Sequence, residues 1–361
     1  MNILACTSSD RPYNSLRPEH EIYIDMAKSG HNITIITHPN ELYRQRFLDH
    51  NIDLIEQPIT IKISPESIRL IRKTINEKSI DIVFATNSKT IPKCALACIG
   101  LPTKLVVYRG TASGLYWYDP GNYLSVLNPR VDAIICVSKY VYDYVATLKV
   151  LKHKNITAIF KGHDIAWYDK PPANLEEFGV HPGDFTAICV TNPRPHKGID
   201  VLLKAADLLA DIDNFHLILV GKGIDKEPYR SLLNTNRMKP RIHLAGYRYD
   251  APELIAASDV LIQPSTSGEG LPRVILESLA YGTPVIASAN PGSMEIIDDG
   301  KNGYIVPVGS FQALADRIRN LYNSPETLQS LIENTKNKLE NELSHRRTVD
   351  NYIAYFESLV S

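Results

Sequence analysis

Two carboxylates eight positions apart carry the strongest chemical signal in this chain. Glu269 and Glu277 bracket a Gly-Leu-Pro turn and the start of an apolar helix. A strand that looks buried, residues 259–265, stands directly before them. A strand, a small-residue turn and a helix with free amides at its start form a site suited to an anionic ligand. A phosphate site alone would not favour two glutamates, so the pair needs a further explanation.

Flanking segments extend this pattern in a fixed order. Pro264-Ser265 comes before the pair, Gly282-Thr-Pro284 follows it, and the segment from Glu295 to Gly303 comes next. On these residues, the stretch 259–307 resembles the donor-site signature of the family 4 glycosyltransferases, a retaining group with the two-domain GT-B architecture. The resemblance reaches back to about residue 185 and, more weakly, covers the whole chain. It implies transfer of a hexose-type sugar from a UDP- or GDP-sugar to a glycan or lipid-linked acceptor, in bacterial polysaccharide or lipopolysaccharide synthesis.

The resemblance gives each carboxylate a role. It implies that Glu277 binds the ribose diol of the donor. It implies that Glu269 contacts the transferred sugar, aided by the backbone amides of Gly270 and Leu271, with the helix starting near Pro272. The alternative for Glu269 is a favourable interaction with the helix dipole alone, worth about 0.3–1 kcal/mol.

Two cations follow the first strand of the C-terminal series of strands. Arg194 and Lys197 lie in a loop that opens a helix at Gly198. Departure of a nucleoside diphosphate develops negative charge that a catalyst must stabilise. The sequence shows no cluster of metal ligands, so we expect no metal and no cofactor, with Arg as a bidentate donor and Lys as a point charge. The family pattern also has an Arg and a Lys-Gly pair in this loop; the alternative is two solvated cations.

A second loop is expected to border the nucleobase. The match places Gly246 and Tyr247 there, with Tyr247 available for stacking; ordinary packing of the ring is nearly as plausible.

The N-terminal half departs from the family pattern. Many relatives have a Gly-Gly turn after the first strand, where this chain has Thr7-Ser8-Ser9-Asp10, and Ser9 is a candidate sugar contact. Many also have a histidine after the fourth or fifth strand, where this chain offers Arg109. Arg109 either meets the substrates or forms a structural ion pair. His163 closes this half in a hinge turn and is a secondary candidate.

Composition sets the broad class. The 361 residues are 44% hydrophobic and 22% charged, with a net charge of −1, which suits two globular domains. No run of 18 apolar residues and no signal peptide is visible. The five scattered cysteines suit reduced, buried thiols, so we expect a cytoplasmic protein.

Charge is uneven along the chain. Residues 1–164 hold 20 Lys and Arg against 15 Asp and Glu. A solvated surface is one explanation; the other is contact with an anionic membrane at its inner face or with a lipid-linked diphosphate. Nucleic acid is disfavoured, because no basic stripe with interleaved aromatics is present. The aromatic run Tyr116-Trp-Tyr-Asp119 could anchor at lipid or stack on sugar, but loop packing is the first interpretation.

Short apolar runs alternate with helical patterns throughout, which predicts parallel sheets covered on both faces. We therefore expect an α/β protein with the GT-B fold: two doubly wound, Rossmann-like domains whose parallel sheets face a central cleft. The N-terminal, acceptor-binding domain spans 1–164, the nucleotide-sugar domain spans 165–344, and a last helix, 345–361, packs back on the first. The predicted strands are 3–6, 32–37, 80–84, 104–107, 133–137, 157–160, 186–191, 215–220, 241–245, 260–263, 284–287 and 304–306.

Two other functions remain open at this point. A nucleotide-sugar epimerase with the GT-B fold would need acid and base groups in the first domain, and the paired glutamates speak against it. A non-catalytic nucleotide-sugar-binding subunit would keep the donor site and lose the acceptor chemistry, which the departures at Thr7–Asp10 and Arg109 leave open.

Overall fold

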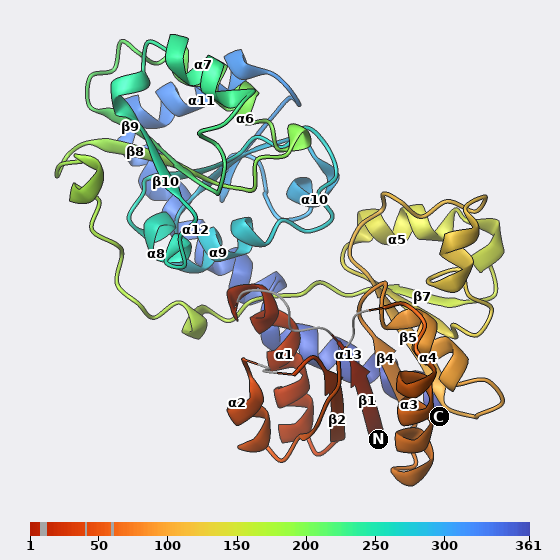
Figure 1. The fold of residues 1–361 in the computed structure, drawn as a ribbon. Coiled ribbons are helices and arrows are strands. Elements are labelled where there is room, and N and C mark those ends of the chain that lie inside the picture. Colours follow the sequence, from red (N-terminus) through yellow and green to blue (C-terminus); the bar gives the residue numbers. More distant parts are fainter. Residues whose placement is uncertain (8–12, 40–41, 59–60) are drawn as a thin grey trace. The chain divides into compact units, whose positions relative to one another are not determined.

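The computed structural model describes residues 1–361 except 8–12, 40–41 and 59–60. It divides into two compact units, which are described separately (Figure 1). The first unit is Met1–Gly162 together with His345–Ser361, and the second is His163–Ser344.

A seven-stranded, all-parallel sheet forms the centre of the first unit. Its strand order is β3-β2-β1-β4-β5-β6-β7. The order reverses between β1 and β4, which gives a topological switch point at that place. The strands are β1 (Asn2–Cys6), β2 (Asn32–Thr37), β3 (Asp53–Glu56), β4 (Ile82–Ala85), β5 (Lys104–Arg109), β6 (Ala133–Cys136) and β7 (Asn155–Ala158).

The last helix of the chain belongs to the first unit. Tyr352 and Phe356 of α13 (His345–Val360) pack their rings edge-on against Phe84 of β4 at 5.7 and 5.6 Å. Both are fully buried, so the helix completes the core beside α1 (Tyr13–Lys28). The other helices of this unit are α2 (Arg44–Leu48), α3 (Pro65–Glu77), α4 (Ile91–Ala97) and α5 (Lys139–Ala146).

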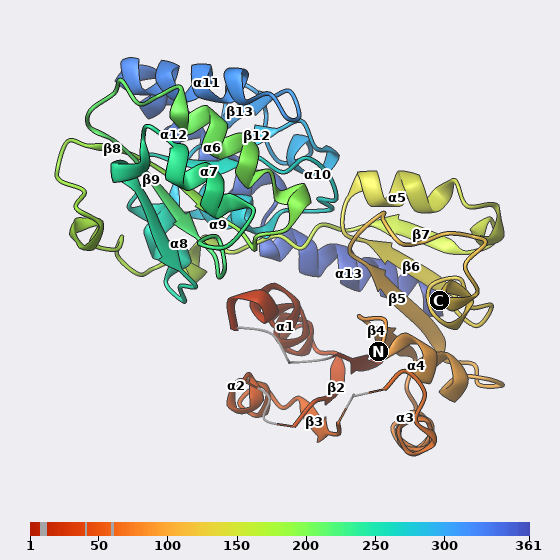
Figure 2. The ribbon, with the colours of Figure 1, turned by 45° about the horizontal axis from the view of Figure 1, so that its top comes forward.

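The second unit has the same plan with six parallel strands. The order β10-β9-β8-β11-β12-β13 places the switch point between β8 and β11. Figure 2 shows helices covering both faces of the sheet. The strands are β8 (Phe185–Val190), β9 (Phe215–Val220), β10 (Ile242–Gly246), β11 (Val260–Gln263), β12 (Val285–Ser288) and β13 (Gly303–Val306).

Two helical layers sandwich this second sheet. One layer contains α6 (Ile199–Asp207), α7 (Tyr229–Thr235) and α11 (Phe311–Asn323), and the other contains α8 (Ala251–Ala256), α9 (Arg273–Tyr281) and α12 (Pro325–Glu342). The short α10 (Pro291–Met294) follows β12.

The predicted fold class is confirmed: both halves are parallel, doubly wound and Rossmann-like. The sequence prediction missed β3, a four-residue edge strand whose residues are only half-buried or exposed, so its hydrophobic signal is weak. Helix α1 spans Tyr13–Lys28 and continues through Pro18, although proline lacks the N–H that the helix would use. Within the described residues, no helix is both long and apolar enough to cross a membrane.

Candidate functional site

The switch point of the second unit brings the predicted cations and carboxylates together. β8 and β11 are neighbours and both end at the same edge of the sheet. The loop after β8 contains Arg194 and Lys197, and the loop after β11 contains Ser265 and Glu269. Ligands of open α/β sheets bind outside the carboxyl ends of strands at such a point. This edge is therefore the candidate functional site.

Three donors converge on one oxygen of Glu269. Lys197 Nζ lies 2.6 Å from Oε1, Ser265 Oγ donates to it at 2.7 Å, and Gln263 Nε2 donates at 3.1 Å. The residue is 8% exposed, so these contacts hold a nearly buried carboxylate in one orientation. No residue of the described chain donates to Oε2. That second oxygen is the one that a ligand hydroxyl can reach.

Close backbone contacts surround this carboxylate. A Cβ on Gly292 would stand only 2.7 Å from the backbone oxygens of both Glu269 and Gly270. Gly198 has φ +68°, and a Cβ there would collide with the backbone oxygen of Pro264. Only glycine permits both approaches. The loops after β8, β11 and β12 are thereby packed backbone to backbone.

Glu277 lies in the second turn of α9, as predicted, and is 4% exposed. Burial raises the pKa of its carboxyl group, and the charge of Arg273 opposes that rise. Arg273 Nε lies 2.9 Å from Glu277 Oε1, one helical turn away. Arg273 is 42% exposed at its side chain, so the ion pair joins a buried acid to a cation that can move into solvent.

The other residues predicted to contact the nucleotide sugar lie at the same edge of the sheet, and some of them are exposed. Arg194 is exposed, and its side chain does not cap the short 3-10 helix Pro195–Lys197 that follows it. Tyr247 follows β10, is 49% exposed, and meets Tyr249 edge-on at 5.1 Å. Gly246 accepts a hydrogen bond from the Gly221 amide at 2.7 Å, which ties the ends of β9 and β10 together. The ring of Tyr247 is thus accessible for stacking. Leu271 and Pro272 lead directly into α9.

The candidates of the N-terminal half are placed differently. Arg109, at the end of β5, donates from Nε to the Thr111 carbonyl at 2.6 Å and from Nη2 to the Ser113 carbonyl, so it holds its own loop. Burial lowers its pKa below the usual arginine value. His163 is 1% exposed, and its Nδ1 is hydrogen-bonded to the Tyr168 hydroxyl at 2.6 Å. Both placements favour structural roles, and their ligand contacts stay predictions. Ser9 lies outside the described residues.

Sequence reasoning missed three contributors. The sequence pattern places Gln263 in a strand and Ser265 in a flanking segment, and it gives Arg273 no role. Ser265 Oγ and Gln263 Nε2 also lie 2.9 Å apart, so the two side chains form one network with Glu269. The available signal was the polar pair at the end of an otherwise apolar strand. Arg273 could have been found from its i,i+4 spacing to Glu277.

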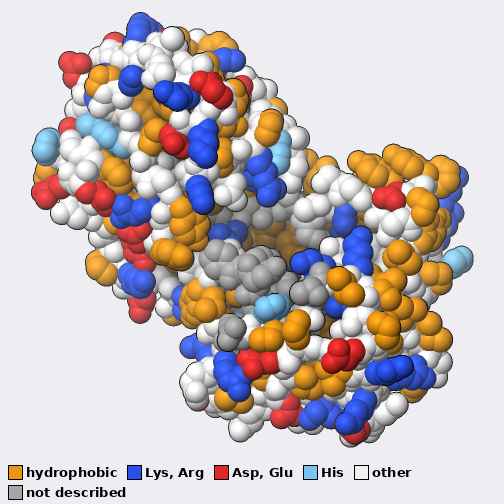
Figure 3. Space-filling view, in the orientation of Figure 1, with side chains coloured by type: hydrophobic (Ala, Val, Ile, Leu, Met, Phe, Trp, Pro, Cys, Tyr) orange, Lys and Arg blue, Asp and Glu red, His pale blue; other side chains and the backbone are white. Residues whose placement is uncertain are grey.

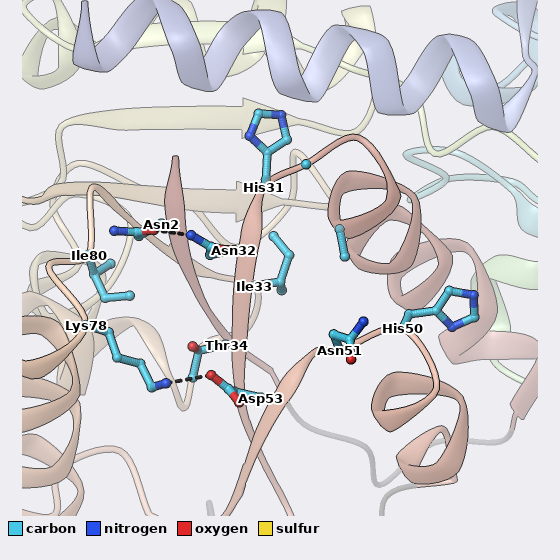
Figure 4. Close-up of a pocket in the computed structure, with 12 residues that line it drawn as sticks. Asn2, His31, Asn32, Ile33, Thr34, His50, Asn51, Asp53, Lys78 and Ile80 are labelled. Atoms are coloured by element: carbon cyan, nitrogen blue, oxygen red, sulfur yellow. Dashed lines mark hydrogen bonds and ion pairs between the residues drawn. The ribbon is translucent and has the colours of Figure 1, made fainter.

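A pocket of about 490 Å³ lies in the first unit, at the amino ends of the strands of its sheet (Figure 4). Its lining includes Asn2, Asn32 and Asp53, each at the start of a strand, and Lys78 Nζ bridges to Asp53 at 2.5 Å. None of the predicted site residues lines it. The described chain also holds no group of three or more His, Cys, Asp or Glu suited to a metal ion.

Family models match both halves of the chain. "Glycosyltransferase Family 4" matches residues 20–167, and "Glycosyl transferases group 1" matches residues 172–338. The second match contains every residue of the donor-site candidate. The chain belongs to the family 4 glycosyltransferases of the GT-B class.

Individual relatives agree with this membership. The lipopolysaccharide core biosynthesis glycosyltransferase LpsE of Rhizobium meliloti is 30% identical over 162 residues, which cover 45% of this chain and 46% of LpsE. The N-acetyl-alpha-D-glucosaminyl L-malate synthase of Bacillus anthracis is 24% identical over 92% of this chain and 90% of its own. The chain thus spans about half the length of LpsE and nearly all of the synthase.

Solved structures share the fold at low identity. A glycosyltransferase from Rickettsia africae superposes with a TM-score of 0.83 at 20% identity, covering 100% of this chain and 98% of its own. The Anabaena protein HepE in complex with UDP-glucose superposes with a TM-score of 0.79 at 21% identity, covering 99% of this chain and all of its own. At this identity the likeness establishes the fold alone.

Proposed function

We propose that this protein is a retaining glycosyltransferase that moves a hexose-type sugar from a nucleotide-diphosphate donor to a glycan or lipid-linked acceptor. The observation that carries the proposal is the pairing of Lys197 with Glu269 at the switch point of the second unit. The cation suits the anionic diphosphate leaving group of a nucleotide sugar, and the carboxylate suits the hydroxyls of its sugar ring.

The residues divide the work of binding. Arg194 and Lys197 face the diphosphate and stabilise the charge that develops on it as the sugar leaves. Glu269, clamped through Oε1, accepts from a sugar hydroxyl through Oε2. Glu277 accepts from the ribose, and Tyr247 stacks on the base. The positive charge comes from side chains, so the proposed reaction needs no metal. We assign no protein nucleophile.

The names of two similar proteins support the proposed nucleotide-sugar donor and the proposed type of acceptor. HepE was crystallised with UDP-glucose, which supports a UDP-sugar as the first donor to test, with GDP-sugars as the comparison. The name of LpsE supports an acceptor of the lipopolysaccharide or polysaccharide type.

The test is a panel of UDP- and GDP-sugars incubated with the purified protein, first without and then with extracted glycan and lipid acceptors. Slow donor hydrolysis, or transfer with the anomeric configuration kept in the product NMR spectrum, supports the proposal. Interconversion of sugars would show an epimerase, and binding without turnover a non-catalytic subunit. Activity lost in EDTA and restored by a divalent cation would contradict the metal-free mechanism.

A further inference from the structure

An exposed group of aromatic side chains follows β5 in the first unit. Trp117 is 63% exposed, Tyr118 65% and Tyr116 42%. Tyr116 and Tyr118 stack at 5.3 Å, and Trp117 meets Tyr118 edge-on at 5.9 Å. These rings therefore contact one another while staying largely exposed, and the loop-packing interpretation stays a prediction. With Tyr123 and Leu124, 37% and 48% exposed, they form what we call the aromatic surface.

The backbone beneath the aromatic surface is held by side chains. Asn122, itself buried, donates through Nδ2 to the carbonyls of Gly114 and Tyr116, each at 3.2 Å. The hydroxyl of Tyr123 donates to the Trp117 carbonyl at 2.8 Å. A fixed loop that presents large rings to solvent loses little conformational entropy when those rings are covered. Clustered exposed rings of this kind mark interaction surfaces.

Two lysines follow the helix on which this loop rests. Tyr144, in the last turn of α5, donates its hydroxyl to the Leu115 carbonyl at 2.6 Å, so the loop rests on the end of that helix. The next turn of chain presents Lys149 and Lys152, both exposed. Neither forms a salt bridge with any described residue, whereas Lys139 on α5 is neutralised by Asp143 at 2.7 Å. Figure 3 shows hydrophobic side chains gathered over the α5 region with Lys or Arg at their margin.

The polar side chains of this loop are already occupied. Asp119 Oδ1 accepts from the Gly121 amide at 2.8 Å, and Asn122 is used as described above. A carbohydrate site combines stacking with side-chain hydrogen bonds to hydroxyls, and the loop's carboxylate and amide are committed to the backbone. Tyr and Trp rings with an aliphatic neighbour and unneutralised lysines instead match the boundary between headgroups and acyl chains.

We propose that the aromatic surface, with Lys149 and Lys152, docks the first unit on an anionic lipid surface. The rings enter the headgroup region while the lysines meet lipid phosphates. This inference extends the proposed function, since a lipid-linked acceptor would lie in such a surface. Its test needs no turnover, so a failure here and a failure of the transferase proposal are distinguishable.

The experiment is co-sedimentation of the full chain with vesicles of phosphatidylcholine alone or mixed with phosphatidylglycerol. We expect binding to the mixed vesicles only. Trp117→Ser/Tyr118→Ser should weaken it about tenfold or more, because two interfacial anchors are lost. Lys149→Gln/Lys152→Gln should weaken it roughly twentyfold, since each basic side chain near an anionic surface is worth about a fivefold change. Tyr249→Ser, which removes an 80% exposed ring from the second unit, is the matched control and should bind as the unaltered protein does.

Fluorescence gives an independent reading of the same contact. The chain has two tryptophans, so Trp167→Phe leaves Trp117 as the sole reporter. A blue shift of its emission on adding mixed vesicles is expected. No sedimentation with mixed vesicles, or equal loss in the Tyr249 control, would overturn the proposal. So would an emission change produced by soluble oligosaccharide and not by vesicles, which would make the surface a sugar platform.

Discussion

The Lys197–Glu269 pair offers a quantitative test of the site. We consider Lys197→Met, Glu269→Gln and the double variant. The side chains are 21% and 9% exposed and the charged atoms lie 2.6 Å apart. Exposed pairs are worth about 0.2–1 kcal/mol, and breaking a fully buried pair costs about 3–5 kcal/mol. A pair of intermediate burial should therefore show a coupling free energy of about 2 kcal/mol.

Lys197→Met should destabilise the second unit more than Glu269→Gln does. Methionine leaves a nearly buried carboxylate with two neutral donors, Ser265 and Gln263, whereas glutamine keeps a hydrogen-bonding group at the position. The free energy of unfolding of all four proteins, measured by urea denaturation, gives the coupling. UDP affinity by calorimetry, measured on the same four proteins, reports whether the site is intact. If the two substitutions have additive effects, with a coupling free energy below about 0.5 kcal/mol, the Lys197–Glu269 contact does not stabilise the fold as expected.

Three further predictions concern other parts of the second unit. Gly292→Ala should reduce UDP affinity at least about tenfold by calorimetry, because its Cβ would meet two backbone oxygens at 2.7 Å and displace the Glu269 loop; unchanged affinity would contradict the close packing. Glu277→Ala should weaken UDP binding roughly a hundredfold by the loss of two charge-assisted hydrogen bonds, and equal binding of UDP and inorganic pyrophosphate, which lacks the ribose, by the unaltered protein would contradict its ribose role. Burial, with His216 beside it, lowers the pKa of His243 to about 4, so the unfolded chain takes up the proton first: the free energy of unfolding should fall between pH 6.5 and about 4 by up to roughly 2 kcal/mol for this half-buried ring. His243→Gln should flatten that slope.

The sequence predicted the architecture well because its strands are buried on both faces. Val260–Gln263 and Phe215–Val220 are mainly apolar runs, interrupted only by Gln263 and His216, and the structure has them with the same bounds. Such runs indicate parallel strands whatever their neighbours do. β3 gave no such signal, since residues 53–56 lie at the sheet edge and are partly exposed. Edge strands depend on pairing, which local composition does not report.

The candidate site likewise has features that the sequence predicted and features that it could not. Lys197 and Glu269 lie 72 positions apart in sequence, and both follow strands that are neighbours at a switch point. The family resemblance assigned each of them a role, but their direct contact was not predicted. Which oxygen each donor uses could not be predicted, because that depends on side-chain rotamers set by packing. The exposed state of Trp117 was missed for a related reason. Its loop is held by Asn122, whose amide in the sequence looks like any loop asparagine.

In the proposed function, the three donors on Glu269 Oε1 would let the lysine and the carboxylate contact two ligand groups without cancelling each other. Lys197 has three donor hydrogens and uses one on Oε1, while Ser265 and Gln263 add two neutral donors to the same atom. If the diphosphate draws Lys197 toward itself, the neutral donors still hold Oε1 and keep Oε2 aimed outward. The carboxylate therefore keeps its orientation when its cation is shared. Without Ser265 and Gln263, a phosphate that attracted Lys197 would release Glu269 from the geometry needed to accept from the sugar. Ser265→Ala should accordingly raise KM for the sugar donor more than it changes UDP affinity. UDP lacks the transferred sugar ring, whose hydroxyls are the proposed donors to Oε2.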